Sequence, residues 1–214
     1  MTPEHLFVND ITDLISANES YNLSLILDQL EKHPLSIAPW EAFPYKPKVA
    51  FSIAHAAGFI YLKYYVSEQQ IRAVNNATNG SVWEDSCVEF FVNFDDKGYY
   101  NLECNAIGTI LLCFGAERSN REMLPAEVIE KIQFQSTIQN NLKDKTVDWT
   151  MTLAIPLSTF THHPSLSLKG KEYHANFYKC GDKLVEPHFV AWSNIDTPKP
   201  DFHRPNFFGR LVFE

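Results

Sequence analysis

An indole and several carboxyl groups lie within one short stretch of the chain and together could bind a polyhydroxylated ligand. Residues 82–94 read Val-Trp-Glu-Asp-Ser-Cys-Val-Glu-Phe-Phe-Val-Asn-Phe, so that Trp83 directly precedes Glu84 and Asp85, and Glu89 follows. An aromatic ring can cover the C–H face of a sugar while carboxylates accept hydrogen bonds from its hydroxyls. The stretch therefore predicts a ligand site where the chain enters a strand, at the rim of a sheet.

Alternating residue types predict that this stretch continues into the first of two paired strands. Apolar side chains occupy every second position from 88 to 94 and again from 100 to 106, with the turn sequence Asp-Asp-Lys-Gly between them. A period of two is typical of strands that bury one face. Keeping both apolar rows on the same face favours a register with Val92 opposite Leu102, since a slip of one residue would turn every side chain over.

The same register gathers polar side chains on the other face of the two strands. It sets Glu89 opposite Asn105 and Phe91 opposite Glu103, so Glu89, Glu103 and Asn105 are expected to lie together. Two interpretations are open at this point. The face is either a solvated outer surface or the floor of a binding site.

Composition restricts the class of protein. The 214 residues are 45% hydrophobic and 14% aromatic, which is enough to bury a substantial core. The formal net charge of -8 disfavours a nucleic-acid partner or an anionic membrane surface, because both require clustered Lys and Arg. No long apolar run suggests a membrane span, and we expect neither a nucleic-acid nor a membrane partner.

The N-terminal residues Met-Thr-Pro-Glu-His lack a basic segment followed by an apolar stretch, so no signal peptide is visible. We therefore expect a cytoplasmic location by default, or an extracellular or periplasmic one if a leader was removed. The four cysteines, Cys87, Cys104, Cys113 and Cys180, lack the spacing of a metal motif. We expect free thiols, two or three of them buried.

The whole chain predicts an all-β fold, an antiparallel β-sandwich with one or two short peripheral helices. A helical pattern occupies residues 21–31, prolines then interrupt the chain as far as residue 47, and 125–131 could form one or two helical turns. Eight to ten strands are expected, among them 49–54, 59–66, 109–114, 132–137, 147–155, 173–180, 189–194 and 209–213. We interpret 1–214 as a single domain in which 1–47 forms an N-terminal helix and an extended lead-in segment.

The sequence resembles the family 9 carbohydrate-binding modules and their wider DOMON-like relatives over roughly residues 40 to 214. The similarity is carried by Trp83-Glu84-Asp85-Ser86-Cys87-Val88-Glu89, by Phe189-Val190-Ala191-Trp192-Ser193-Asn194, by Phe208-Gly209, and by segments 176–182 and 201–205. The resemblance implies a jelly-roll sandwich and non-catalytic binding of a mono- or oligosaccharide. No catalytic residue is implied.

The resemblance also implies roles for individual side chains. Trp83 and Trp192 would hold a terminal sugar between two indole plates. Glu89 and Asn176 would make hydrogen bonds to its hydroxyls, and we expect Asn105 to do the same because the strand register places it on the same polar face. The family motif has an Arg where this chain has Glu103, a departure that bears on sugar choice because a carboxylate cannot donate as a guanidinium does.

No cofactor is expected apart from a structural calcium ion, which the resemblance permits. Asp95 and Asp96 are the candidate ligands, since calcium is held by clustered oxygen atoms.

Two other functions remain open. The first is a glycan-processing hydrolase that uses Glu89 and Glu103 as paired carboxylates, or Cys87 with a histidine. The second is a module that binds a protein partner through the loop at His203 and Arg204. No nucleophile motif precedes a helix to support the hydrolase.

Overall fold

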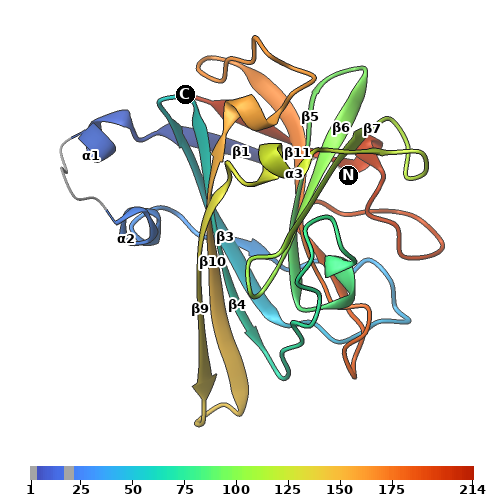
Figure 1. Ribbon diagram of the computed structural model, residues 1–214. Helices are drawn as coiled ribbons and strands as arrows, with labels where there is room; N and C mark the ends of the chain where they lie inside the picture. Colours follow the sequence, from blue (N-terminus) through green and yellow to red (C-terminus); the bar gives the residue numbers. More distant parts are fainter. Residues whose placement is uncertain (1–3, 17–21) are drawn as a thin grey trace.

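Strands are the main secondary structure of the computed structural model, which describes residues 4–16 and 22–214 (Figure 1). The strands are β1 (His5–Asp10), β2 (His33–Leu35), β3 (Lys48–Ala56), β4 (Phe59–Glu68), β5 (Cys87–Asp95), β6 (Gly98–Asn105), β7 (Ile110–Gly115), β8 (Glu122–Met123), β9 (Gln133–Asn141), β10 (Thr146–Pro156), β11 (Glu172–Cys180), β12 (Phe189–Ala191) and β13 (Gly209–Phe213). The helices are α1 (Thr12–Ser16), α2 (Leu23–Asp28) and α3 (Ala126–Ile129), with 3-10 turns η1 (Val82–Glu84), η2 (Leu157–Thr159) and η3 (Pro205–Phe207). Among these described helices, none has the length and apolar character required to cross a membrane. The predicted all-β sandwich with short peripheral helices is confirmed.

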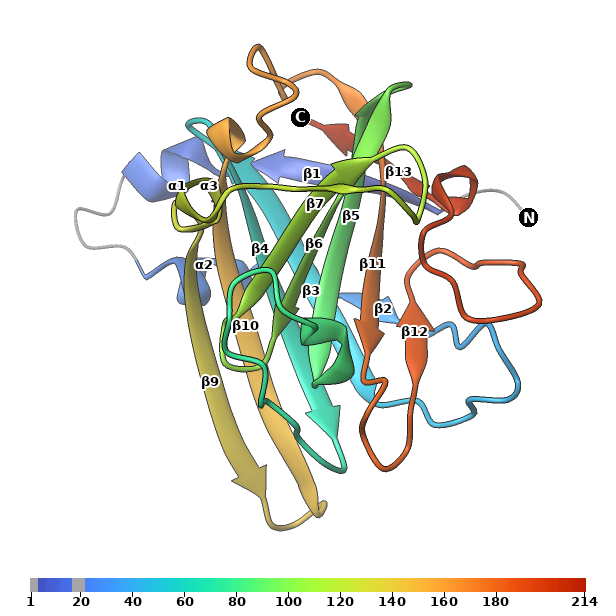
Figure 2. The same cartoon turned by 45° about the vertical axis from the view of Figure 1, so that its right-hand side comes forward.

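Two layers of strands face each other, and β1 joins them. One layer has the order β8-β7-β6-β5-β11-β13, with β12 alongside β11, and the other has the order β3-β4-β10-β9, with β2 alongside β3. Figures 1 and 2 show β1 running between the two layers. Its first half pairs with β13 (Leu6 opposite Leu211) and its end pairs with β3 (Asn9 opposite Ala54), both in parallel. The pairing of the other strands in these orders is antiparallel.

The main hydrophobic core fills the space between the layers. Phe51 of β3 stacks on Phe177 of β11 with ring centroids 3.8 Å apart, and Phe90 of β5 stacks on Phe177 at 5.1 Å. Tyr64 and Trp149 are also buried in this cluster. The rings come from strands of both layers, so removing any one of them would leave a cavity in the sandwich.

The N-terminal segment contains more structure than the predicted helix and lead-in. It forms β1, α1, α2 and β2. The predicted helix is present but shorter, because Asn22 caps it through a hydrogen bond from Leu25 N to its Oδ1. Only Leu6 and Val8 of β1 are buried, which gives a pattern too short to be distinctive in the sequence. Tyr21, where the helix was expected to begin, and the first three residues lie outside the described residues.

The pairing of β5 with β6 differs from the predicted register by two residues. Phe90 lies opposite Leu102 and Glu89 lies opposite Glu103, whereas Val92 was expected opposite Leu102. The hairpin closes tightly, with Asp95 opposite Gly98 and a bulge between Asn93 and Asp95, instead of through a four-residue loop. A shift of two residues preserves the faces, so the polar side chains remain together although their partners change.

The hairpin between β3 and β4 shows how local sequence sets a turn. Ala56 pairs with Phe59, which leaves Ala57 and Gly58 as the two turn residues, with φ of 46° and 84°. Two-residue hairpin turns of this kind need positive φ at both positions, and glycine adopts it without steric cost.

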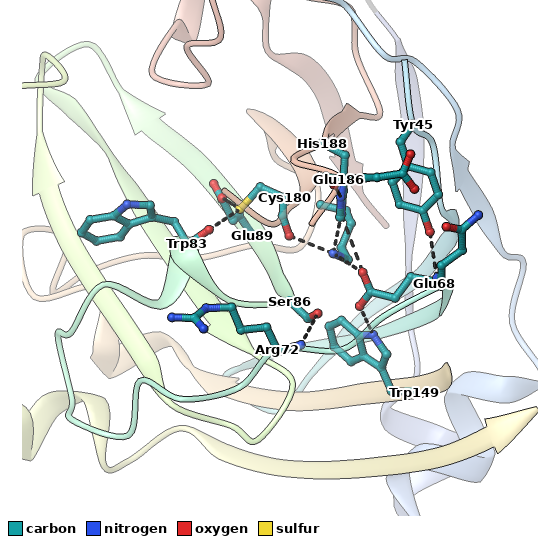
Figure 3. A network of polar contacts seen from close by, with 12 residues as sticks. Tyr45, Glu68, Arg72, Trp83, Ser86, Glu89, Trp149, Cys180, Glu186 and His188 are labelled. Carbon is teal, nitrogen blue, oxygen red and sulfur yellow. Dashed lines mark hydrogen bonds and ion pairs between the residues drawn. The ribbon is translucent and has the colours of Figure 1, made fainter. Parts of the chain in front are cut away.

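A buried ion pair connects the two layers near one end of the core. Lys179 occupies an inward-facing position of β11, and its Nζ lies 2.9 Å from Glu68 Oε2 at the end of β4, with both side chains fully buried. Lys179 Nζ also lies 2.8 Å from His188 Nε2, and Trp149 Nε1 donates to Glu68 Oε1 at 2.7 Å (Figure 3). Each charge is thus surrounded by partners, as a buried ion pair requires.

We predict that Lys179→Met lowers the free energy of unfolding by about 3–5 kcal/mol, because it leaves the Glu68 carboxylate buried without its cation. The double variant Glu68→Gln with Lys179→Met should recover a large part of this loss, because both charges are removed. Urea unfolding followed by far-UV circular dichroism measures both.

Lys97→Met is the matched control, since Lys97 is 78% exposed in its ion pair with Asp95. It should change stability by less than about 1 kcal/mol. A Lys179→Met protein as stable as the control would show that the buried pair does not hold the layers together.

Candidate functional site

A pocket of about 470 Å³ lies on the outer face of the β5–β6–β7–β11 sheet, on the side away from the main core. Its floor is formed by strand residues, and loops form its walls. The lining residues include Trp83, Glu89, Asn101, Glu103, Cys113, Arg118, Arg121, Cys180, Asp182, Phe189, Asp201, Phe202 and His203. We call it the Glu89–Glu103 pocket.

Two carboxyl groups lie opposite each other on the floor of this pocket. Glu89 and Glu103 form a cross-strand pair and are only 3% and 4% exposed. Glu89 Oε1 accepts a contact of 2.9 Å from Cys180 Sγ, and Glu103 Oε1 accepts a hydrogen bond of 3.0 Å from Asn101 Nδ2. Glu103 Oε2 is buried without a hydrogen-bond partner. A buried oxygen without a partner is unusual in a folded protein and indicates a place where a ligand can donate a hydrogen bond.

Burial determines the protonation of these two groups. It raises the pKa of Glu89 well above its ordinary value of 4.5, and the nearby Cys180 and Glu103 raise it further. Burial also raises the pKa of Glu103 to about 7. Neutral carboxyl groups can donate as well as accept, so the floor offers both kinds of hydrogen bond.

Trp83 forms one wall of the pocket. It lies in η1 immediately before β5 and is 37% exposed, whereas Trp40, Trp149 and Trp192 are at most 7% exposed. Its carbonyl oxygen accepts a hydrogen bond from Asp182 N at 3.1 Å and a contact from Cys180 Sγ at 3.5 Å, so the end of β11 fixes its position (Figure 3).

Asp182 lies beside this wall. Burial raises its pKa to about 6, with the Glu84 carboxylate adding to the shift.

A buried aspartate anchors the loop behind Trp83. Asp85 Oδ2 accepts hydrogen bonds from Val74 N at 3.0 Å and Asn75 N at 2.9 Å, and its Oδ1 lies 3.2 Å from Arg72 Nε. Asn105 Nδ2 donates to the same Oδ2 at 3.0 Å. This network fixes the backbone from which the exposed indole projects.

The segment 200–203 forms another part of the pocket wall. His203 Nδ1 lies 2.9 Å from Tyr99 Oη, and burial lowers the pKa of this imidazole to about 3, with the Arg121 charge lowering it further. His203 is therefore neutral at physiological pH. Phe202 stacks on Tyr178 at 4.0 Å, which ties this wall to β11.

Arg121 brings a guanidinium group close to the pocket floor. Its Nε donates to Asn101 Oδ1 at 2.7 Å, its Nη2 donates to Tyr99 O at 2.6 Å, and the group lies 4.0 Å from the centroid of the Tyr99 ring. Its positive charge acts on Glu103 and opposes the rise of that pKa. Because most of its N–H donors are bonded within the chain, Arg121 holds the pocket floor in place and has few donors left for a ligand.

The family model of carbohydrate-binding family 9 matches residues 19–213. The chain belongs to this family. It is similar to a candidate carbohydrate-binding protein of Bacteroides uniformis, with 39% identity, complete coverage of both chains and a TM-score of 0.89. No curated protein matches the chain.

Two solved structures of a family 9 module from Caldicellulosiruptor kristjanssonii share the fold. The complex with cellotriose has a TM-score of 0.66 at 12% identity and covers 99% of this chain and 94% of the module. The complex with glucose has a TM-score of 0.64 at 12% identity and covers 99% and 96%.

Within this family 9 chain, three of the six predicted site residues come together. Trp83, Glu89 and Glu103 line the same pocket. The shared face of Glu89 and Glu103 follows from the period of the strands, and the position of Trp83 follows from its place before β5.

Trp192 occupies a different position from the one expected, and this corrects the prediction of two indole plates. Its ring is 7% exposed and lies in the main core, 5.5 Å from Phe177 and 6.1 Å from Phe51. A side chain on Gly209 would collide with this ring, because a Cβ there would be 2.4 Å from it. Trp192 therefore packs between the sheets and does not reach the Glu89–Glu103 pocket.

Asn105 and Asn176 are also away from the pocket, which corrects their predicted contacts with a ligand. Both are fully buried. Asn105 Nδ2 donates to Asp85 and to Asn75 O, and its Oδ1 accepts from Thr109 N. The Asn176 amide pairs with both backbone groups of Ser193, at 2.9 and 3.0 Å. Their amides hold loops in place, so they are not free to contact a sugar.

Several pocket residues were not predicted from the sequence. Asp182, Asp201 and His203 lie in segments that carry the family resemblance, and this was a usable signal. Arg118 and Arg121 lie in the loop between β7 and β8, where no periodicity marks them.

The aspartates considered for calcium have contacts within the chain. Asp95 Oδ2 lies 3.2 Å from His163 Nε2 and 3.5 Å from Lys97 Nζ, while its Oδ1 accepts from Lys97 N. Its oxygens are therefore already engaged with donors, and Asp95 and Asp96 as calcium ligands remain a prediction.

We predict that Glu103→Gln flattens the dependence of stability on pH between about 4.5 and about 7. The folded protein holds the Glu103 proton up to a pKa of about 7, whereas the unfolded chain releases it near 4.5. Binding of this proton stabilises the folded protein fully below pH 4.5. As pH rises from 4.5 towards 7, the free energy of unfolding falls by up to about 1.4 kcal/mol per pH unit.

Urea unfolding at several pH values between about 5 and about 8 measures this slope. Glu127→Gln is the control, because Glu127 is exposed on α3, and it should retain the parental slope. A Glu103→Gln slope equal to that of the control would contradict the raised pKa.

Proposed function

We propose that the Glu89–Glu103 pocket binds a mono- or oligosaccharide without catalysing a reaction on it, and that Trp83 stacks on one sugar ring. The observation that carries this proposal is a 37% exposed indole that lines the same pocket as a buried carboxyl oxygen without a partner. Sugars need an apolar plate for their C–H face and hydrogen-bond partners for their hydroxyls, and this pocket offers both.

The chemistry of the floor supports a neutral polyhydroxylated ligand. Burial raises the pKa of the Glu89 carboxyl, which favours its protonated form, and raises the pKa of the Glu103 carboxyl to about 7, so that Glu103 is partly protonated near pH 7. Such groups can accept from one hydroxyl and donate to another. Asp182 and Asp201 add acceptors at the walls. The formal net charge of -8 disfavours polyanionic ligands such as nucleic acid.

Trp83 supplies the indole ring of the pocket, and two phenylalanine rings line another part of it. Phe189 and Phe202 line the pocket there, and their rings are 6.0 Å apart in an edge-to-face arrangement. A volume of about 470 Å³ lies within the range of small-molecule sites. We infer that the pocket accepts the end of a glycan, with Trp83 as the main stacking surface.

A glycan hydrolase is the second candidate, favoured by the direct cross-strand pairing of Glu89 and Glu103. Glycosidases that retain configuration need one ionised carboxylate as nucleophile and one protonated acid. Here burial raises the pKa of both groups, which disfavours an ionised nucleophile. Assaying the same sugars for product, with Glu89→Gln as the test variant, distinguishes hydrolysis from binding.

We predict that Trp83→Ala weakens sugar binding by about five- to thirtyfold, since loss of aromatic stacking removes on the order of 1–2 kcal/mol. Glucose and cellotriose, the ligands in the two structures of the Caldicellulosiruptor module, are the first probes. Titration calorimetry measures the affinity, and tryptophan fluorescence of the parent protein follows the environment of the indole.

Two variants control this experiment. Trp83→Phe keeps an aromatic plate and should bind more tightly than Trp83→Ala. Phe134→Ala removes a 50% exposed ring on β9, outside the pocket, and should bind like the parent. Saturable binding that survives Trp83→Ala would move the sugar site elsewhere, and the absence of binding across a broad sugar panel would favour a protein partner.

A further inference from the structure

Two cysteines and a glutamate converge beneath the floor of the Glu89–Glu103 pocket. Cys87 at the start of β5 lies directly opposite Cys180 at the end of β11, and Glu89 is two residues further along the same face of β5. One ligand atom from each residue lies within 4.8 Å of the other two. Among the described residues, these three form the one group of His, Cys, Asp or Glu side chains gathered this closely.

These three side chains are rigidly held. All three belong to the paired central strands and are at most 3% exposed. Their separation suits a single metal ion, because two ligands bound at about 2.0–2.3 Å from one ion lie about 3–4 Å apart. Ligands carried by paired strands keep their geometry better than ligands carried by loops.

The donor set selects the class of ion. Thiolate sulfur is a soft ligand that favours zinc-like cations, whereas calcium and magnesium favour oxygen alone. Two thiolates and one carboxylate carry three negative charges, so a bound divalent ion leaves the site with a net charge of -1. The same composition distinguishes this site from the aspartates considered above for calcium.

An independent observation indicates room for a fourth ligand. Cys180 and Glu89 line the pocket themselves, so a bound ion would face open space. Glu103, whose Oε2 is buried without a partner, lines the same pocket opposite Glu89. Asp182 lies close enough for its charge to act on both Glu89 and Cys180. Carboxyl oxygens thus lie near the thiols, and a bound cation would favour the ionised forms of both kinds of group.

We propose that Cys87, Cys180 and Glu89 form a binding site for a zinc-like divalent cation, with a fourth coordination position open to the Glu89–Glu103 pocket. Binding displaces protons from the two thiols and from the carboxyl group and forms two metal–sulfur bonds and one metal–oxygen bond. Water or Glu103 completes the coordination. The inference does not rest on sugar binding, because it concerns the ion alone.

The test uses the full chain, treated with a chelator and kept reduced with a phosphine. We expect one equivalent of Co²⁺ to bind and to produce thiolate-to-cobalt charge-transfer absorption in the near ultraviolet, and Zn²⁺ to displace it. X-ray absorption at the zinc edge should then show sulfur neighbours at about 2.3 Å together with oxygen or nitrogen neighbours at about 2.0 Å.

Variants assign the ligands. Cys87→Ser and Cys180→Ser should each weaken binding at least tenfold and reduce the charge-transfer band. Cys104→Ala should change neither, because Cys104 lies in the main core on the other face of the sheet and outside the group of three. The native circular dichroism spectrum of each variant checks that it has folded.

Three results would overturn the proposal. They are the absence of charge-transfer absorption in the reduced parent protein, a zinc-edge spectrum without sulfur neighbours, and an equal loss of binding in Cys104→Ala. The spectra of the parent protein decide the question even if a cysteine variant does not fold.

Discussion

The central sheet of this protein is covered on both faces, and the rest of the molecule depends on that constraint. β6 is buried along its whole length, and so are the first six residues of β5 and the last six of β11. One face packs in the main core with Phe90 and Phe177. The other carries a second apolar cluster, including Phe91 and Tyr178, which the loops with Phe202 and Phe208 cover. Polar side chains on this second face are removed from water, so each must find a partner within the chain or in a ligand.

Features of this arrangement that depend on local residue patterns could be predicted from the sequence, whereas features that depend on contacts between distant segments could not. Alternation is local, so it correctly gave the longer strands from β3 onward, the common face of Glu89 and Glu103, and the position of Trp83 at a strand entrance, but it missed the short strands β1, β2 and β8. It did not give the register of β5 and β6, because a bulge and a tight turn are set by backbone geometry that no pattern records. The loop residues Arg121 and His203 have no period at all, and their approach to the pocket is a result of tertiary packing.

Trp192 illustrates a different limit. Val190 and Trp192 share one side of their segment and lie in the main core, while Ala191 belongs to the second cluster. The spacing of the residues predicts that Trp192 and Val190 point to the same side of the segment. It does not show whether that side faces the main core or the Glu89–Glu103 pocket. The family resemblance assigned it to the ligand, and the crowded contact with Gly209 shows how completely the core encloses it.

Positive charge near the pocket comes from a loop in this family member. The resemblance implied an Arg on the strand that carries Glu103, and Arg121 brings a guanidinium to the same region from between β7 and β8. Its hydrogen bonds to Tyr99 and Asn101 attach that loop to the floor. Selectivity in such a pocket is therefore open to change through loop sequence, while the sheet below stays the same.

The parallel pairing of β1 with β13 has a consequence for how the chain acquires its shape. Leu6 meets Leu211, so partners about 200 residues apart in the sequence form the seam that joins the two layers. Contacts this distant carry a large loop-closure entropy and tend to form late and slowly. During synthesis the first strand emerges from the ribosome long before its partner exists. Its unpaired edge is then open to wrong associations that the finished sandwich excludes.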